Sequence, residues 1–302
     1  MSTNGIGEKA RRLVHMKVQM PLGRLVGLTL GTFVLGAWFS TSSHSPASQQ
    51  AVEPPRRLPG VGLAVARVVP GGSECDLQLR KIFDKGLWKG VDLAAYDAMA
   101  SAMDKVMPEI EEGHSGQMTV ERQAYVAVAQ LPCVRRICEI GFNGGHSAGL
   151  WLRAAPQADV LMFDLWNYTY NSRGEAFLRD SANGQKFGLA DADRRLTIVK
   201  GSSLTTVPAY AREHPDVKCD VLSVDGGHFE DIARADLWSM FNLANRNFHV
   251  LLLDDTNCEG FWCNGPIAAL QHAMSLGLVR YIAGITEENV GRGLSILQYV
   301  KS

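Results

Sequence analysis

Short apolar runs alternate with stretches of helical periodicity from residue 134 to the end of this 302-residue chain. Each apolar run has the length of a strand, and glycine or polar residues follow most of them. Such alternation predicts an α/β fold, because neighbouring parallel strands need a crossover connection that is usually a helix. We expect a mostly parallel, seven-stranded sheet with helices on both faces, its strands at residues 134–140, 160–163, 196–200, 221–224, 250–253, 278–282 and 295–299.

A glycine-rich turn follows the first predicted strand, in the segment ICEIGFNGGHSA at residues 137–148. Glycines let the backbone bend sharply and approach a ligand, and the free N–H groups of the next helix favour an anionic group. The dinucleotide pattern G-x-G-x-x-G fails here, because Asn143 and His146 stand where it needs glycines. The spacing E-x-G-x-x-x-G fits instead, as Glu139, Gly141 and Gly145. A tight turn without a ligand is the alternative.

Polar residues also follow the next four predicted strands. Asp164 ends the second strand, where an acid can accept hydrogen bonds from both hydroxyls of a ribose, or can simply cap a helix. The later strand ends carry Ser202 and Ser203, then Asp225 and His228, then Asp254 and Asp255. Because the carboxyl ends of parallel strands meet at one edge of a sheet, we expect these side chains to form one site.

The pattern of these strand ends resembles that of class I S-adenosylmethionine-dependent methyltransferases. E-x-G-x-x-x-G, D-G-x-H and a strand ending in D-D-T, over roughly residues 120–300, resemble the small-molecule and sugar O-methyltransferases related to catechol-type enzymes. The resemblance implies a Rossmann-like fold and methyl transfer from S-adenosyl-L-methionine to a hydroxyl of a small molecule or sugar. The acid that the family usually has after the third strand is replaced by Ser202. By resemblance, the cofactor-binding residues are Glu139, Gly141, Asn143, Gly145, Ser147, Asp164, Ser202, Ser203 and Asp225.

The resemblance also implies a divalent cation. In metal-dependent members, an acid after the fourth strand and an acidic pair after the fifth hold the ion, and the matching residues are Asp225, Asp254 and Asp255. Mg²⁺ or another hard cation prefers such oxygens and would lower the pKa of a substrate hydroxyl. His228, with Asp225 as the second catalytic residue, would act as general base. Alternatively, His228 only starts a helix, Asp255 caps a turn, and no metal is used.

The N-terminal segment has a different composition from the rest. Lysine and arginine gather in residues 8–24, whereas residues 25–43 carry no charge. Residues 20–40 are about long enough for one bilayer crossing. The positive-inside rule then leaves residues 1–19 cytosolic and the rest on the far side. We predict a single-pass signal anchor, with a cleaved targeting peptide or an ordinary helix as alternatives.

The remaining chain divides by pattern into three parts. Residues 41–73 are rich in Ser, Gln and Pro in their first half and read as a stem or linker; residues 74–130 have helical periodicity and are expected to form a cap; residues 131–302 form the α/β domain. This order predicts a membrane protein of the secretory pathway or an organelle, with a luminal catalytic domain. Six cysteines are too few for a disulfide scaffold in a chain of this length. An oxidising lumen would allow a small-loop bond between Cys258 and Cys263, which the sequence leaves open, and Cys138 is expected to be a small core residue.

Charge limits the classes of partner. The net charge of −1 gives no sign of a nucleic-acid-binding surface. The expected partners are a small-molecule or sugar acceptor and, through the N-terminal helix, a membrane. Two other functions remain open: a membrane-anchored Rossmann-like binding protein without catalysis, and a nicotinamide-dependent Rossmann enzyme.

Overall fold

The computed structural model describes residues 73–110, 115–287 and 290–300. The chain divides into two units, residues 1–66 and 67–302, and the described residues all lie in the second. The predicted basic N-terminus and membrane anchor, with the stem up to residue 72, lie outside the described residues. No helix among the described residues is both long and apolar enough to cross a membrane.

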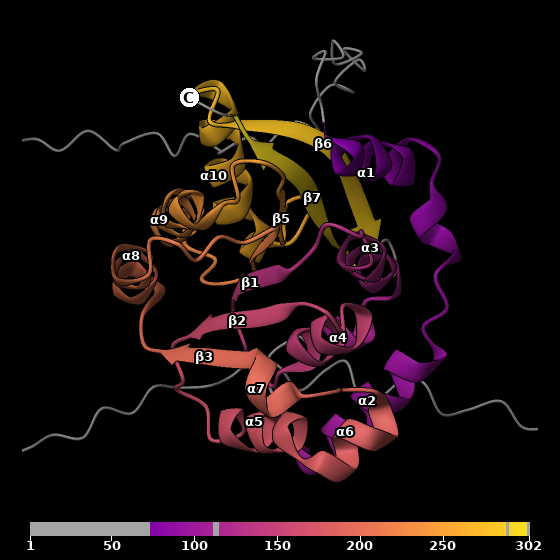
Figure 1. The fold of residues 1–302 in the computed structure, drawn as a ribbon. Helices are drawn as coiled ribbons and strands as arrows, with labels where there is room; N and C mark the ends of the chain where they lie inside the picture. Colours follow the sequence, from indigo (N-terminus) through magenta and orange to yellow (C-terminus); the bar gives the residue numbers. More distant parts are fainter. Residues whose placement is uncertain (1–72, 111–114, 288–289, 301–302) are drawn as a thin grey trace, which may run out of the picture. The chain divides into compact units, whose positions relative to one another are not determined.

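A seven-stranded sheet forms the centre of the second unit, in the order β3-β2-β1-β4-β5-β7-β6 (Figure 1). The first five strands pair in parallel, whereas β7 runs antiparallel to both β5 and β6. The predicted α/β class and mostly parallel sheet are therefore confirmed. The strands are β1 (Arg136–Ile140), β2 (Asp159–Asp164), β3 (Leu196–Lys200), β4 (Val221–Val224), β5 (Val250–Leu253), β6 (Val279–Glu287) and β7 (Arg292–Tyr299).

Helices cover both faces of this sheet, as predicted. Successive residues of a strand point to opposite faces, and Ile137 and Cys138 accordingly belong to two different hydrophobic cores. The first core contains side chains of α1–α6, and the second contains those of α8–α10. The helices, including short 3-10 turns, are α1 (Glu74–Asp84), η1 (Leu87–Gly90), α2 (Ala94–Val106), η2 (Ser115–Gln117), α3 (Thr119–Ala129), α4 (His146–Ala154), α5 (Asn171–Arg179), α6 (Ser181–Phe187), α7 (Ala192–Arg195), α8 (Ser203–Glu213), α9 (Glu230–Met240), η3 (Phe241–Leu243), η4 (Phe261–Cys263) and α10 (Asn264–Ser275).

The N-terminal helices pack on the sheet as part of its first core. Tyr125 of α3 stacks on Trp151 of α4, with the ring centroids 4.7 Å apart, and both rings are buried. The side chain of Glu287, at the end of β6, accepts a hydrogen bond from the backbone N–H of Glu121 and so caps the start of α3. Helix α3 is therefore held at its start by the end of β6 and through Tyr125 by α4, which places its first turn beside the strand ends.

All six cysteines are paired in three disulfides, which corrects two expectations from the sequence. Cys138 is not only a core residue: it lies on β1 and is bonded to Cys219, just before the neighbouring strand β4. The six cysteines do form a disulfide framework, and the sequence could not reveal it because the pairing depends on the strand order. The bond between Cys258 and Cys263, which the sequence left open, is formed. The disulfides are Cys75–Cys133, Cys138–Cys219 and Cys258–Cys263.

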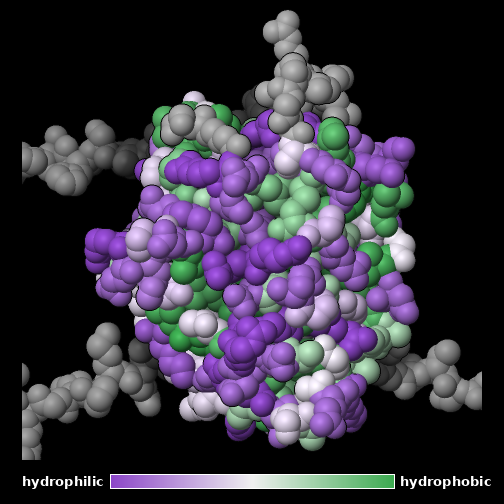
Figure 2. All heavy atoms as spheres, in the orientation of Figure 1, coloured by the Kyte–Doolittle hydropathy of each residue, from purple (hydrophilic) through white to green (hydrophobic). Residues whose placement is uncertain are grey.

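The surface of the described residues is mixed in polarity. In the space-filling view, hydrophilic side chains cover most of the face shown, with apolar side chains interspersed among them (Figure 2). Single exposed apolar residues of this kind are normal for a folded protein.

Candidate functional site

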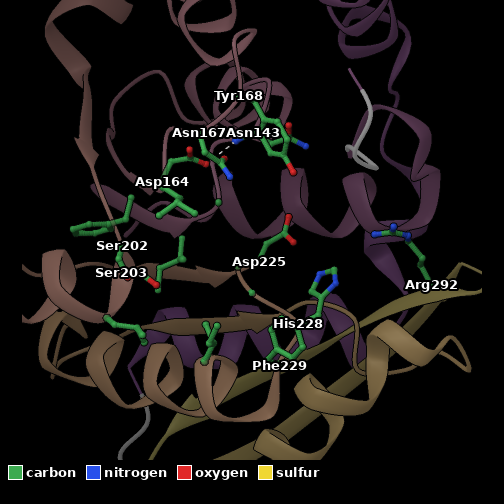
Figure 3. A pocket seen from close by; sticks show the side chains of 18 residues that line it. Asn143, Asp164, Asn167, Tyr168, Ser202, Ser203, Asp225, His228, Phe229 and Arg292 are labelled. Atoms are coloured by element: carbon green, nitrogen blue, oxygen red, sulfur yellow. Dashed lines mark hydrogen bonds between the residues drawn. The ribbon is translucent and has the colours of Figure 1, made fainter. Parts of the chain in front are cut away.

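A pocket of about 510 Å³ opens at the carboxyl ends of the parallel strands (Figure 3). It lies beside β1 and β4, where the strand order reverses, which is the usual ligand site of an open α/β sheet. Its volume falls within the range of about 300–1,000 Å³ that is typical of small-molecule sites. The predicted site residues that line it are Gly141, Asn143, Asp164, Ser202, Ser203, Asp225 and His228.

The glycine turn after β1 depends on two glycines. Gly141 has a φ of 107°, and a Cβ placed on it would lie 1.9 Å from the carbonyl oxygen of Asp225. Gly145 has a φ of 84°, and a Cβ there would lie 2.7 Å from the ring of Phe142. No side chain fits at either position, so the turn passes directly beside the end of β4 and its backbone forms part of the pocket wall.

Asp164 holds this turn in place from the end of β2. Its Oδ2 accepts hydrogen bonds from the backbone N–H groups of Phe142, at 2.8 Å, and Asn143, at 3.0 Å. Its Oδ1 accepts one from the backbone N–H of Trp166 at 2.6 Å. The carboxylate still faces the pocket and has acceptor capacity left, since two oxygens offer about four lone-pair sites.

Three predicted cofactor residues, Glu139, Gly145 and Ser147, do not line the pocket. The carboxyl group of Glu139 is fully buried and accepts hydrogen bonds from Ser147 Oγ at 2.7 Å, Trp151 Nε1 at 3.0 Å and Ser223 Oγ at 2.9 Å. Burial raises the pKa of Glu139 to about 8. This carboxyl group ties β1, α4 and β4 together beneath the pocket. The contact of Glu139, Gly145 and Ser147 with a cofactor stays a prediction.

Four carboxyl groups meet at the ends of β4 and β5. Asp225, Asp254 and Asp255, which the sequence brings to these strand ends, are joined by Glu121 from the first turn of α3. Burial, followed by the charge of Asp255, raises the pKa of Asp225 to about 6. Burial, followed by the charge of Asp225, raises the pKa of Glu121 to about 8. The sequence pattern does not single out Glu121, because an acid in the first turn of a helix usually faces solvent.

Asp255 is flanked by two nitrogen-bearing side chains. Its Oδ2 lies 3.1 Å from Nε2 of His228, and its Oδ1 lies 3.7 Å from Nη1 of Arg292, which also lines the pocket. Burial raises the pKa of Asp255, and Arg292 and His228 act against this rise. Arg292 was not predicted, because it starts β7 and reaches the site only through the antiparallel pairing of β7 with β5.

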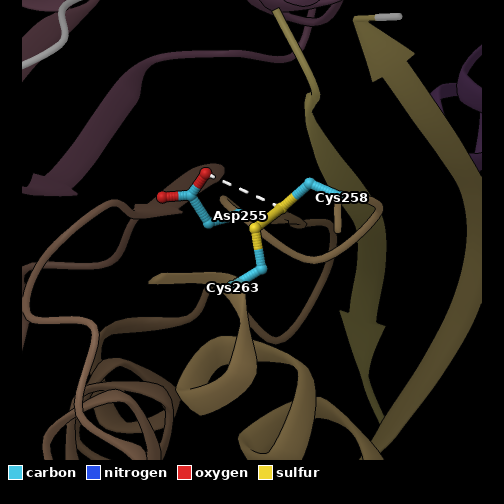
Figure 4. A group of neighbouring side chains, drawn as sticks. All are labelled: Asp255, Cys258 and Cys263. Atoms are coloured by element: carbon cyan, nitrogen blue, oxygen red, sulfur yellow. Dashed lines mark hydrogen bonds between the residues drawn. A yellow bond between two sulfur atoms is a disulfide. The ribbon is translucent and has the colours of Figure 1, made fainter. Parts of the chain in front are cut away.

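The carboxyl groups of this cluster are of the kind that binds a divalent cation, but their oxygens do not come together as closely as the ligands of a metal site would. Oδ1 of Asp254 is buried and has no hydrogen-bond partner among the described residues, as an atom that awaits a ligand would be. Within the described part of the chain, however, the three side chains that bring possible metal-binding atoms within 4.8 Å of one another are Asp255, Cys258 and Cys263 (Figure 4). The two sulfurs form a disulfide, so they offer no thiolate to a metal.

Comparison with known families agrees with this geometry. Residues 138–256 match a family described as a methyltransferase domain. The matched segment begins in β1 and ends after Asp255, so it contains the glycine turn and every aspartate of the pocket. The resemblance to class I methyltransferases that the motifs predicted is thereby confirmed. A comparison with curated proteins finds no similar sequence.

Solved structures share the fold at low sequence identity. A cofactor-bound protein from MTB, Rv0187, is 21% identical with a TM-score of 0.53, over 72% of this chain and 96% of that one. A protein named as an O-methyltransferase from Klebsiella pneumoniae is 15% identical with a TM-score of 0.50, over 75% and 97%. One named as a caffeoyl-CoA O-methyltransferase from Staphylococcus aureus is 12% identical with a TM-score of 0.51, over 74% and 100%. At these identities the likeness establishes the fold.

Proposed function

We propose that this chain, which carries a methyltransferase domain over residues 138–256, transfers a methyl group from S-adenosylmethionine to an oxygen of a small molecule or sugar. One observation carries the proposal: the glycine turn, Asp164, Ser202, Ser203 and His228 line a single pocket of suitable size. These residues come from four strand ends that lie far apart in the sequence. A match to the family's motifs does not by itself bring their side chains into one pocket.

Different residues of the pocket bind different parts of the cofactor. The backbone of the glycine turn receives the methionine part of the cofactor, and Asp164 accepts hydrogen bonds from its ribose hydroxyls. Ser202 and Ser203 lie at the third strand end and contact the adenine edge. When bound, S-adenosylmethionine supplies a methyl group on a sulfonium centre that is open to in-line displacement. The chain's own contribution is mainly to align the acceptor with that methyl group.

His228 is the proposed general base. Its Nε2 lies 3.1 Å from Asp255, so its Nδ1 is the ring nitrogen that accepts the proton of the acceptor hydroxyl. Asp255 then stabilises the imidazolium that forms. The acceptor oxygen bonds to the methyl carbon as the carbon–sulfur bond breaks, so the products are the methyl ether, S-adenosylhomocysteine and a proton on His228.

We also propose that Mg²⁺ or another divalent cation binds at Asp225, Asp254 and Asp255. The unpartnered oxygen of Asp254 and the carboxylate chemistry of the cluster support it. A cation there would polarise the acceptor hydroxyl and lower its pKa. Mn²⁺ binding, followed by electron paramagnetic resonance in the protein without substrate, tests the site. Loss of binding in Asp254→Asn is expected, and wild-type protein that binds no Mn²⁺ removes the proposal.

The cellular compartment in which the domain works is a separate proposal. We propose that the domain works in an oxidising compartment of the secretory pathway or an organelle, held by residues 20–40 as a single-pass anchor. Pairing of all six cysteines supports it, because disulfides persist in such compartments and are rare in the cytosol. Thiol alkylation of protein taken directly from cells, followed by mass spectrometry, is expected to find no free thiol. Six alkylated cysteines would exclude the luminal placement.

Calorimetric titration of S-adenosylhomocysteine into the purified full-length chain tests the main proposal. Binding is expected, and NAD, the cofactor of the rival nicotinamide enzyme, is expected not to bind. A folded chain that binds NAD in place of S-adenosylhomocysteine would overturn the proposal. Added Mg²⁺ in a parallel titration separates an effect on cofactor binding from an effect on the later methyl transfer.

A further inference from the structure

Arg292 is a positive charge inside the pocket with unused hydrogen-bond donors. Of the residues that line the pocket in the described part of the chain, it is the only lysine or arginine. Its guanidinium group has five N–H donors. Its contacts are the 3.7 Å ion pair with Asp255, too long for a hydrogen bond, and the ring of Trp262, whose centroid lies 5.8 Å away. Such a group can bind a planar anion with two donors at once.

The position of Arg292 places this charge on the acceptor side. Figure 3 shows Ser202 and Ser203 at one side of the pocket and Arg292 at the other, with Asp225 and His228 between them. The serines belong to the proposed adenine contact, so Arg292 lies beyond the reacting centre. Asp164, Ser202 and Ser203, three of the proposed cofactor contacts, lie on the other side of His228 from Arg292 in Figure 3.

Asp255 sets the distance between the base and the positive charge. One of its oxygens faces His228 and the other faces Arg292. The two groups contact opposite oxygens of one carboxylate, so one small molecule that carries both a hydroxyl and an anionic group can touch both.

We propose that Arg292 binds an anionic group of the acceptor, so that the substrate class is a small hydroxyl compound that carries a carboxylate on the same ring as the hydroxyl that is methylated. Uronic acids and hydroxylated aromatic acids have this arrangement. The inference rests on the proposed function, because it takes the His228 side of the pocket as the place of methyl transfer. Arg292 touches the acceptor in this account and selects it by charge.

Matched pairs of acceptors test the inference on the full-length chain. Methyl transfer from radiolabelled S-adenosylmethionine is measured with glucuronate against glucose, and with protocatechuate against catechol. The acid of at least one pair is expected to be the better acceptor by roughly tenfold or more in kcat/KM. In Arg292→Gln, the ratio of kcat/KM for the acid to kcat/KM for its neutral partner is expected to fall roughly 10- to 100-fold, the loss of one charge-assisted pair of hydrogen bonds, whereas any effect that acts through Asp255 changes both acceptors alike. Arg292→Lys keeps the charge and recovers part of the affinity.

Controls separate this inference from the proposed function. Arg234, exposed on α9 and paired with Glu230, gives a matched variant, Arg234→Gln, that is expected to behave as wild type. Protocatechuate and catechol are also titrated calorimetrically, with and without S-adenosylhomocysteine. Failure of S-adenosylhomocysteine to bind overturns the proposed function alone. Equal binding of the two compounds, binding of neither, or an equal loss of both in Arg292→Gln overturns the role of Arg292.

Discussion

The Nε2 atom of His228 lies 3.1 Å from Oδ2 of Asp255, although the two residues follow different strands, β4 and β5. Neither residue alone would mark a catalytic base. Asp255 is almost fully buried, whereas the side chain of His228 is 39% exposed and lines the pocket. The carboxylate therefore lies next to one ring nitrogen, while part of the imidazole faces the pocket, where an acceptor would bind.

His228→Asn tests the general base. We expect kcat to fall by about 10²- to 10⁴-fold, the usual contribution of a positioned base. Affinity for S-adenosylhomocysteine is expected to stay within about twofold, because His228 lies on the acceptor side of the proposed cofactor contacts. Initial rates and calorimetric titration measure the two effects. A variant with wild-type kcat would show that His228 is not the general base and only precedes the start of α9.

Asp164→Asn tests the ribose contact while it preserves the volume of the side chain. One oxygen still accepts backbone hydrogen bonds from the glycine turn, but the charge is lost. We expect the affinity for S-adenosylhomocysteine to fall about tenfold or more, since a hydrogen bond to a charged group contributes about 1.5–3 kcal/mol. Asp193→Asn, at an exposed position in α7, is the matched control. Unchanged affinity in Asp164→Asn would place the ribose elsewhere.

The disulfides are expected to differ in their contribution to stability. Cys138–Cys219 closes a loop over a sequence separation of 81 residues, whereas Cys258–Cys263 spans 5. In the chain-entropy account, these bonds contribute about 4.5 and about 2 kcal/mol to the free energy of unfolding. Denaturant unfolding of the paired variants Cys138→Ala/Cys219→Ala and Cys258→Ser/Cys263→Ser measures both. Equal losses would show that native packing, and not loop closure, sets the contribution.

The sequence predicted the parallel strands and the site that they carry. The strands at 196–200, 221–224 and 250–253 have the predicted bounds, because each is a short buried run that a turn follows at once. The last two strands are longer than predicted, since Val279–Glu287 and Arg292–Tyr299 form an antiparallel hairpin whose alternating polar residues hide its ends.

What the sequence could not supply is contact between distant elements. Glu121 lies more than a hundred positions before Asp254, and only the packing of α3 on the sheet brings the two carboxyl groups together. Arg292 enters the pocket because β7 inserts between β5 and β6, an order that no local pattern encodes. The pairing of Cys138 with Cys219 has the same cause, since β1 and β4 become neighbours only where the strand order reverses.

The buried carboxyl of Glu139 makes a prediction about pH. Burial raises its pKa from an ordinary value of 4.5 to about 8 in the folded chain. The folded chain then binds one more proton than the unfolded chain between these two values, so this stabilisation is complete below about pH 4.5 and is lost as the pH rises toward 8. Other buried carboxyl groups with raised pKa, such as Glu121, add to the same trend.

Glu139→Gln isolates the part that Glu139 contributes. The amide oxygen can accept from Ser147 and Trp151, and the amide nitrogen can donate to Ser223, whose hydroxyl also accepts, so the buried hydrogen bonds are kept. Because the amide does not titrate, we expect the free energy of unfolding to fall less between pH 5 and pH 8 in Glu139→Gln than in wild type, by an amount on the order of a few kcal/mol. Urea unfolding at pH 5, 6, 7 and 8 gives the two slopes. Parallel slopes would mean that Glu139 is ionised in the folded chain, with Ser147, Trp151 and Ser223 donating enough to offset its burial.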